Sequence, residues 1–383
     1  MATSHDRPAG ASVRARGASS RSGRVLLGVV ACFALVLAAC GDDGDSGAEA
    51  PAKTSTTSGA ETSLDKMSVD ELCAQGKDEG KVTVYGPISP DAMAGVAKAF
   101  ASDHPGIDLE AVTLNVDEIV SRITTEQRGG QFAADVVVND GFRLQQLASV
   151  EAVVPYEPSE KPELLDGLET PDGFPSVAFV TTRAVAYNPS VLEQRGLKVP
   201  TSLEDLTAPE WKENFATTPH GVDIYTGMIE AYGQDEATRL LDALGANQPR
   251  LVESNSQSIT QVQTGDIAAA ISYGTYASPA KQKDPTTVDF FNTDPLLTTT
   301  YFQALAAKAP NQAAARCFIN WFGSADGQQS MVDESGFSSI RGDVENDPEV
   351  WDPEKWEPAF VPVLDLDEYN AQLEQYRAAM KVP

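Results

Sequence analysis

The chain has 383 residues and carries 28 lysines and arginines against 56 aspartates and glutamates, a formal net charge of −28. This excess of negative charge argues against nucleic acid as a partner and against a basic patch for membrane surfaces, because both need a positively charged surface. With three histidines, four cysteines and no match to the common zinc-protease, phosphate-loop, dinucleotide or serine-hydrolase patterns, the sequence does not indicate a familiar catalytic centre.

The N-terminal segment has the pattern of an export signal. Five arginines precede an apolar run over residues 25–37 that contains no charge. This run is shorter than the roughly 20 apolar residues of a membrane-spanning helix, but it has the length of a signal-peptide core. It ends in the letters LAAC, which resemble the bacterial lipobox. We therefore expect residues 1–39 to be a signal peptide and Cys40 to become a lipid anchor in the membrane; a plain secretory signal is the alternative.

A polar segment follows the expected anchor. Residues 40–66 are rich in Gly, Ser, Thr, Ala and Asp and hold almost no large apolar side chain. Such a segment cannot bury enough apolar surface to fold, so we expect a flexible tether that leads to a folded body from about residue 67. Removal of the signal peptide takes away five arginines and one aspartate, which leaves 23 basic and 55 acidic residues and a net charge of −32.

The body begins with alternating strand and helix patterns. Residues 81–86 alternate as a strand, and Ser89 is followed by a proline and an aspartate, which is a typical helix start. Further strands are expected over 107–112 and 134–138, with apolar residues at helical spacing over 116–123 between them. This alternation predicts an α/β fold with a mostly parallel sheet covered by helices.

The same alternation continues to the end of the chain. Strands are expected over 177–187, 215–218, 268–273, 288–291 and 303–307. Helices are expected over 224–244, 312–322, 325–334 and 366–380.

Several short stretches, taken together and in order, carry a resemblance to a known family. They lie at residues 82–100, 134–140 (ADVVVND), 153–156 (VVPY), 184–188 (AVAYN), 211–216 (WKENFA), 264–271 (TGDIAAAI), 308–311 (KAPN) and 324–328. Their order and spacing resemble the extracytoplasmic solute-binding proteins of ABC importers, in the branch with ferric-iron and phosphonate binders.

The resemblance implies a type II periplasmic-binding-protein fold, an α/β architecture of two lobes with mixed sheets and hinge-crossing strands that closes on a ligand. One lobe would hold residues 67–182 and 293–338, and the other residues 183–292 and 339–383. The implied role is to capture a small solute outside the cytoplasm and deliver it to an ABC importer permease. We expect a monomer that is not an enzyme and has no cofactor, unless Fe³⁺ is the transported ligand.

Candidate ligand residues lie just after the carboxyl ends of predicted strands, where ligands bind in open α/β sheets. They are Ser89, Asn139, Asp140, His220, Ser256, Ser258, Tyr273 and Tyr276. Hydroxyl residues at helix starts leave backbone N–H groups free for an anion such as a phosphonate or an organophosphate. The alternative is a purely structural role: a helix cap for Ser89 and Ser256, a turn for Asp140, and a core side chain for Tyr273.

Two of these candidates raise the question of a metal. Iron-binding relatives in the resembled family place two adjacent tyrosines after the late strand, and here the segment reads YGTY from Tyr273 to Tyr276. Tyr273 and Tyr276 are therefore candidate Fe³⁺ ligands, with His220 and Asp223 as candidates to complete a site of hard donors. Because the pair is split by two residues, a small polar or anionic solute is favoured over iron. An accessory or sensory lipoprotein on the same fold, or an enzyme, are the alternative functions.

The cysteines give one further expectation. If Cys40 carries lipid, Cys73 and Cys317 are the cysteines that remain in the mature chain. An even pair outside the cytoplasm predicts a disulfide between them, with two buried thiols as the alternative.

Overall fold

The computed structural model describes residues 64–159 and 164–382. The expected signal peptide, Cys40 and the expected tether up to residue 63 lie outside the described residues. The body begins slightly earlier than expected, because Leu64 is buried against Leu72 and Ala313 and Asp65 forms a 2.8 Å ion pair with Arg316. Within the described ranges, no helix is long and apolar enough to span a bilayer.

The first third of the described chain alternates helices and strands, as predicted. Its elements are α2 (Val69–Glu79), β1 (Lys81–Gly86), α3 (Pro90–Asp103), β2 (Asp108–Thr113), α4 (Val116–Arg128), β3 (Val136–Asp140), α5 (Gly141–Ser149) and β4 (Val153–Val154). Polar caps fix where the helices begin: Ser68 and Asn115 each form a capping box, and Ser89 caps α3 ahead of its first-turn proline.

The middle of the chain holds one long strand and several shorter elements. They are β5 (Val177–Tyr187), α6 (Pro189–Arg195), the 3₁₀ turns η1 (Glu204–Thr207) and η2 (Pro209–Trp211), β6 (Phe215–Thr217), α7 (Val222–Tyr232), α8 (Gln234–Ala246), β7 (Arg250–Leu251), α9 (Asn255–Thr264), β8 (Ala269–Tyr273), α10 (Gly274–Lys283) and β9 (Asp289–Asn292). The helical patterns expected over 224–244 form two helices, which are separated at Gly233 with its φ of +82°.

The last part of the chain returns through a second long strand. Its elements are β10 (Leu296–Ala306), α11 (Gln312–Phe322), α12 (Ala325–Ser335), β11 (Pro358–Phe360) and α13 (Leu366–Met380). β10 is longer than the strand predicted over 303–307. Its first part was missed because it includes three consecutive threonines, which carry little hydrophobic signal. In the structure these threonines are buried and their backbone pairs with β5.

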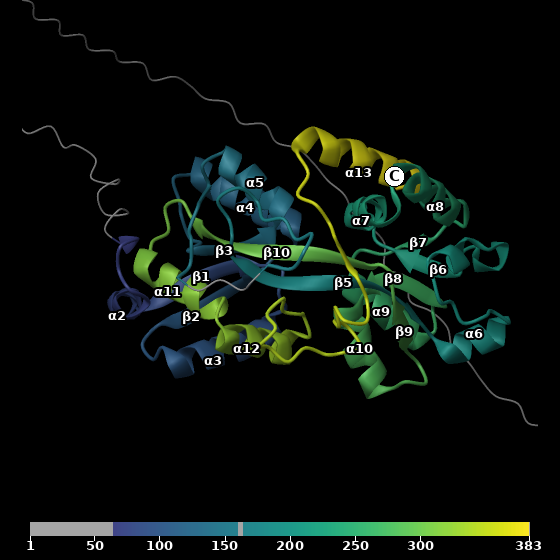
Figure 1. Ribbon diagram of the computed structural model, residues 1–383, viewed down its shortest axis with the longest axis horizontal. Helices are drawn as coiled ribbons and strands as arrows, with labels where there is room; N and C mark the ends of the chain where they lie inside the picture. The colour runs from purple at the N-terminus through teal and green to yellow at the C-terminus, as the bar shows by residue number, and fades with distance from the viewer. Residues whose placement is uncertain (1–63, 160–163, 383) are drawn as a thin grey trace, which may run out of the picture. The chain divides into compact units, whose positions relative to one another are not determined.

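The strands form one mixed sheet in the order β2-β1-β3-β10-β5-β8-β6-β7. The central strand β5 changes partners along its length: residues 177–182 pair with β10, whereas residues 183–187 pair with β8 and β9. β5 and β10 lie antiparallel through the middle of the described fold, between the strands on either side (Figure 1). The change of partner falls at Thr182 and Arg183, so the half of the sheet beside β10 meets the half beside β8 at these two residues.

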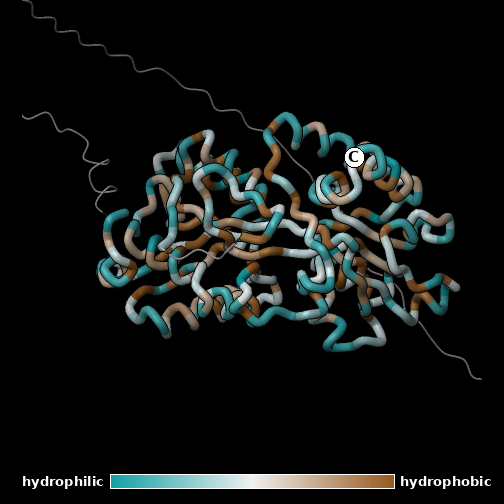
Figure 2. Tube along the Cα trace, in the orientation of Figure 1, coloured by the Kyte–Doolittle hydropathy of each residue, from teal (hydrophilic) through white to brown (hydrophobic). Residues whose placement is uncertain are grey.

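Buried apolar side chains gather on both sides of that junction. Two clusters contain residues of β1, β3, α3 and α11, and two others contain residues of β6, β8, α7, α8 and α9. The chain is hydrophobic along the strands and more hydrophilic on outer helices such as α13 (Figure 2). The sheet is thus covered by helices that bury one stripe each.

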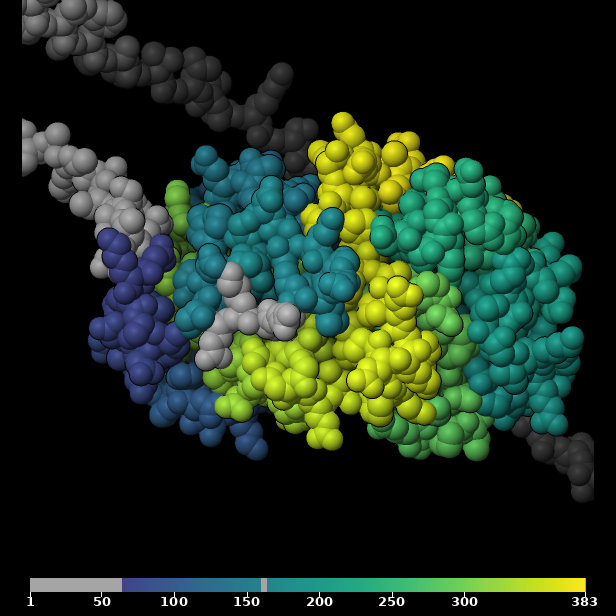
Figure 3. Space-filling model, viewed as in Figure 1, coloured from purple at the N-terminus to yellow at the C-terminus, as the bar shows by residue number. Residues whose placement is uncertain are grey.

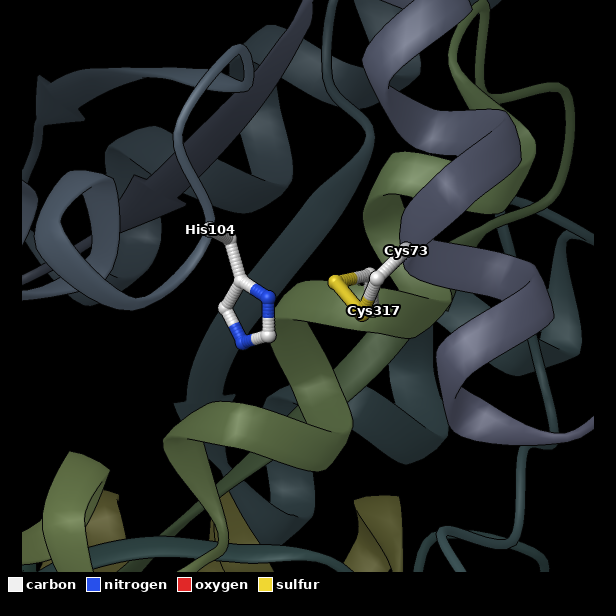
Figure 4. A group of neighbouring side chains, drawn as sticks. All are labelled: Cys73, His104 and Cys317. Carbon is white, nitrogen blue, oxygen red and sulfur yellow. A yellow bond between two sulfur atoms is a disulfide. The ribbon is translucent and has the colours of Figure 1, made fainter.

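A disulfide joins the start of the described chain to its returning part. Cys73 on α2 and Cys317 on α11 are bonded, across a sequence separation of 244 residues (Figure 4). Both cysteines are buried. The predicted disulfide is therefore present, and it ties α2 to a helix that contacts it over much of its length.

Candidate functional site

A cavity of about 660 Å³ lies where β5 changes partners. Its walls come from the loop before α4 and from α4 itself, from β5, from the first turns of α9 and α10, and from β10. Residues that are far apart in the sequence, such as Asn115, Ser256 and Phe337, therefore border the same space. A volume of this size is within the range of small-molecule sites.

One side of β5 forms the inner wall of this cavity. Phe179, Thr181 and Arg183 all line it, as expected for alternate residues of a strand, whose side chains point to the same face. All three side chains are almost fully buried, and among the described residues the Thr181 hydroxyl and the Arg183 Nε have no hydrogen-bond partner. The wall thus carries unsatisfied polar groups, which are uncommon in a protein interior.

A buried ion pair closes the end of this wall. The Nη2 of Arg183 binds Asp223 Oδ2 and donates to the Tyr273 hydroxyl at 2.8 Å. Asp223 Oδ2 also accepts the Tyr273 O–H at 2.8 Å and the Thr299 O–H at 3.1 Å. Burial alone would raise the pKa of Asp223, but the charge of Arg183 and these hydrogen bonds hold that pKa below its ordinary value.

Aromatic rings line the opposite part of the cavity. Phe179 is stacked between Tyr301, with ring centroids 4.6 Å apart, and Phe337, at 4.3 Å. Tyr276 packs edge-on against Phe337 and lies 6.3 Å from the ring of Tyr273. Tyr276 and Tyr301 are the half-buried members of this group, and within the described part of the chain their hydroxyls have no hydrogen-bond partner. Burial raises the pKa of both phenols, so they are neutral at physiological pH.

A second, smaller cavity of about 100 Å³ borders the same junction. It shares with the larger one the lining residues Val116, His220, Asp223, Tyr273 and Tyr301. Its other lining residues come mainly from α5, α7, β10, the segment after β11 and α13. Here Phe142 of α5 stacks on Tyr369 of α13, with ring centroids 3.8 Å apart. Figure 3 shows the C-terminal segment, in yellow, on the surface between the teal and green parts of the chain.

The structure brings four of the eight candidate ligand residues together. His220, Ser256, Tyr273 and Tyr276 all line the larger cavity. Tyr273 is the last residue of β8 and the N-cap of α10, and Tyr276 lies in the first turn of α10. The Tyr273 hydroxyl is already bound to Asp223 and Arg183, whereas that of Tyr276 has no hydrogen-bond partner in residues 64–159 and 164–382.

The other four candidates lie outside the larger cavity. Asp140 caps α5 and binds Arg143 at 2.6 Å, and it lines the smaller cavity. Ser89 is the exposed N-cap of α3, and Asn139 donates to the Val116 carbonyl at 3.0 Å. Ser258 is fully buried and donates to the Asn255 carbonyl at 2.6 Å. The contacts of these side chains are those of helix caps and loop supports.

Sequence reasoning missed the residues that the long strands contribute. Thr181, Arg183 and Tyr301 lie inside β5 and β10, not after a strand end, so a search of strand ends could not find them. The available signal is in β5, where a charged residue interrupts an otherwise apolar and hydroxyl-bearing run. A buried arginine in a central strand needs a buried partner, which here is Asp223.

A second group of potential ligand atoms lies at the disulfide. In the described ranges, Cys73, His104 and Cys317 have their ligand atoms within 4.8 Å of one another (Figure 4). The two sulfurs are bonded to each other, so neither is the thiolate that a metal would need. His104 is half-buried against Phe100, with ring centroids 5.2 Å apart.

Comparison with known proteins gives the class of this molecule. The chain belongs to the bacterial extracellular solute-binding protein family, which it matches over residues 86–329. A curated relative, the Fe(3+)-binding periplasmic protein of Serratia marcescens, is 26% identical over 193 residues, which are 47% of this chain and 53% of that protein. The aligned part of the chain thus spans about half the length of that relative.

Solved structures agree on the fold. Iron-bound HitA from Pseudomonas aeruginosa aligns with a TM-score of 0.64 and 22% identity, over 78% of this chain and 99% of that one. AfuA from Actinobacillus pleuropneumoniae, with exogenous fructose-6-phosphate bound, aligns with a TM-score of 0.68 and 16% identity, over 79% and 99%. The predicted type II periplasmic-binding-protein fold is confirmed. The family model that matches describes bacterial extracellular solute-binding proteins.

Proposed function

We propose that this protein captures a small solute in the larger cavity and delivers it to the permease of an ABC importer. The observation that carries the proposal is the position of the cavity, at the point where β5 leaves β10 and pairs with β8. The walls of the cavity belong to both halves of the sheet, the half beside β10 and the half beside β8. A ligand between them contacts both halves at once and therefore favours a closed arrangement.

The proposal divides the body into two lobes, one with residues 67–182 and 293–338 and the other with 183–292 and 339–383. The grouping of core side chains supports most of this division. However, Ile340, Trp351 and Phe360 pack with the first core group, so the second lobe's C-terminal share is better restricted to α13 and the residues beside it. β5 and β10 are the proposed hinge strands.

Capture is best tested by blocking the cavity. Ser256 is an exposed residue of α9 that lines the cavity, and Thr260 is exposed one turn further along the same helix and does not line it. Native mass spectrometry of the mature protein, incubated with an extract of growth medium, should show a 1:1 adduct with the wild type and with Thr260→Trp. Ser256→Trp should lose the adduct. An adduct that persists in Ser256→Trp would contradict the proposed site.

Two classes of solute are suggested by the comparisons and by the site. Fe(3+) is named for the Serratia protein and iron for HitA. The hydroxyls of Tyr276 and Tyr301, which line the cavity together with His220, are hard donors of the kind that ferric iron needs. An organophosphate is named for AfuA, and the N-terminus of α9 at Ser254 and Asn255 offers backbone N–H groups for an anion.

We also propose that Cys40 anchors the protein to the membrane through lipid. The arginine-rich flank, the short apolar run and the LAAC letters support this. Cys40→Ser should move the protein from the membrane fraction to the soluble extracytoplasmic fraction, because one covalent lipid site is the only anchor proposed. Cell fractionation with immunoblotting measures this, and a variant that stays in the membrane fraction as the wild type does would contradict it.

A further inference from the structure

The larger cavity carries an excess of negative charge. Its charged lining residues are four carboxylates and one guanidinium: Asp117, Glu118, Asp223, Glu253 and Arg183. At its border Arg143 binds both Asp117 and Asp140, which adds one charge of each sign. The balance is therefore three negative charges, with histidine not counted. Such a lining attracts cations and opposes anions, in the same sense as the net charge of the whole chain.

The positive charge of Arg183 does not offset this field for an incoming ligand. Arg183 is buried, is bound to Asp223, and lies over the ring of Tyr273 with its guanidinium carbon 3.8 Å from the ring centroid. Asp223 uses only Oδ2 for its three contacts, and its Oδ1 has no partner within the described part of the chain. With 17% of its side chain exposed and both cavities beside it, Asp223 still has an oxygen for a cation.

Two aromatic side chains of the cavity, Tyr276 and Tyr301, are half-buried and can contact a ligand. Both faces of Phe179 are covered by Tyr301 and Phe337, so Phe179 supports the wall and does not meet the solute directly. Tyr301 stacks on Phe179, and Tyr276 meets Phe337 edge-on, so both half-buried rings lie at the cavity. Aromatic faces bind ammonium groups through the ring quadrupole.

A buried group without a partner lies beside these rings. Thr181 is 2% exposed and lines the cavity between Phe179 and Arg183, and no described residue forms a hydrogen bond with its hydroxyl. Buried hydroxyls normally have a partner, and an N–H or O–H group of a ligand would supply the missing one.

We propose that the solute is a small organic cation, a protonated amine or a quaternary ammonium compound. It is held against the rings of Tyr276 and Tyr301, and the carboxylates of Asp223 and Glu253 balance its positive charge. This rests on the proposed function, because it names the solute class of the same cavity. The volume of about 660 Å³ fits an organic molecule rather than a bare ion.

Ferric iron and organic cations make different demands on the tyrosines. Iron would bind the phenolate oxygens, so removal of the hydroxyls by Tyr276→Phe or Tyr301→Phe would abolish its binding. An organic cation would contact the ring faces, which phenylalanine keeps and leucine lacks. The pair of substitutions at each position thus separates the two classes of ligand, and two independent positions guard against one variant that fails to fold.

Titration calorimetry of the mature body with four probes tests the inference: choline, spermidine, ferric nitrilotriacetate and glucose 6-phosphate. At least one of the two organic cations should bind 1:1 with a Kd below about 100 μM. Tyr276→Leu and Tyr301→Leu should weaken that binding by about tenfold, and the phenylalanine variants should change it by less than about threefold. Glu253→Gln should weaken it, whereas Glu230→Gln, an exposed carboxylate away from the cavity, should not.

The outcomes separate this inference from the proposed function. If neither organic cation binds, or if the phenylalanine and leucine variants lose binding equally, the organic-cation inference is wrong. If ferric nitrilotriacetate or glucose 6-phosphate instead binds 1:1 and Ser256→Trp removes that binding, the proposed function stands with another solute. If 1:1 binding of any probe is unchanged in Ser256→Trp, the proposed function fails as well.

Discussion

Asp223→Ala is expected to lower the free energy of unfolding by about 3–5 kcal/mol, because it leaves the buried charge of Arg183 without its partner. The same change also removes the acceptor of the Tyr273 and Thr299 hydroxyls. Urea unfolding followed by circular dichroism measures the loss. Glu236→Ala, which breaks an exposed ion pair with Arg239, is the matched control and should leave stability almost unchanged.

A double variant distinguishes the ion pair from simple loss of packing. Arg183→Met together with Asp223→Ala removes both charges, so it should be more stable than Asp223→Ala alone. If the double variant is the less stable of the two, the uncompensated charge of Arg183 does not cause the instability of Asp223→Ala, and the expected role of the ion pair is contradicted.

Loss of the disulfide between Cys73 and Cys317 is expected to have the second large effect. The bond closes a sequence separation of 244 residues, and removal of a native disulfide costs about 2–5 kcal/mol, chiefly by freeing the unfolded chain. The Cys73→Ala and Cys317→Ala double variant should therefore unfold at clearly lower urea concentration than the wild type.

Reduction provides the control for that variant. Wild-type protein treated with dithiothreitol keeps both cysteine side chains, which are buried in the core, and loses only the bond. Its stability should fall nearly as far as that of the double variant. A reduced protein as stable as the oxidised one would show that the link between α2 and α11 does not contribute to stability.

The fold was predictable because its signals are local. Helix starts at Ser89 and after Asn115 follow from capping chemistry, and the buried strand at 177–187 and the helices at 312–322 and 366–380 follow from hydrophobic pattern. The polar first part of β10 was missed, because its burial depends on pairing with β5 and β11 and not on its own residues.

The candidate site was only partly predictable, for a related reason. Ligand residues were sought at strand ends, and this rule found His220, Ser256, Tyr273 and Tyr276. It also selected Ser89, Asn139 and Ser258, whose side chains serve local hydrogen bonds, because a cap and a ligand contact have the same sequence pattern.

The remaining cavity residues depend on long-range contacts. The register of β5 against its neighbours places Tyr301 opposite Phe179 and Tyr273 opposite Arg183, while Arg183 meets Asp223 through the packing of α7. That register is a property of the assembled sheet, and no short stretch of sequence reports it.

The most direct test of the account is a crystal structure of the mature protein with the solute that native mass spectrometry detects. The account predicts density in the larger cavity, in contact with the rings of Tyr276 and Tyr301 and within hydrogen-bond distance of Thr181 or Asp223. Density confined to the smaller cavity beside Tyr369, or to the protein surface, with the larger cavity holding only water, would contradict it.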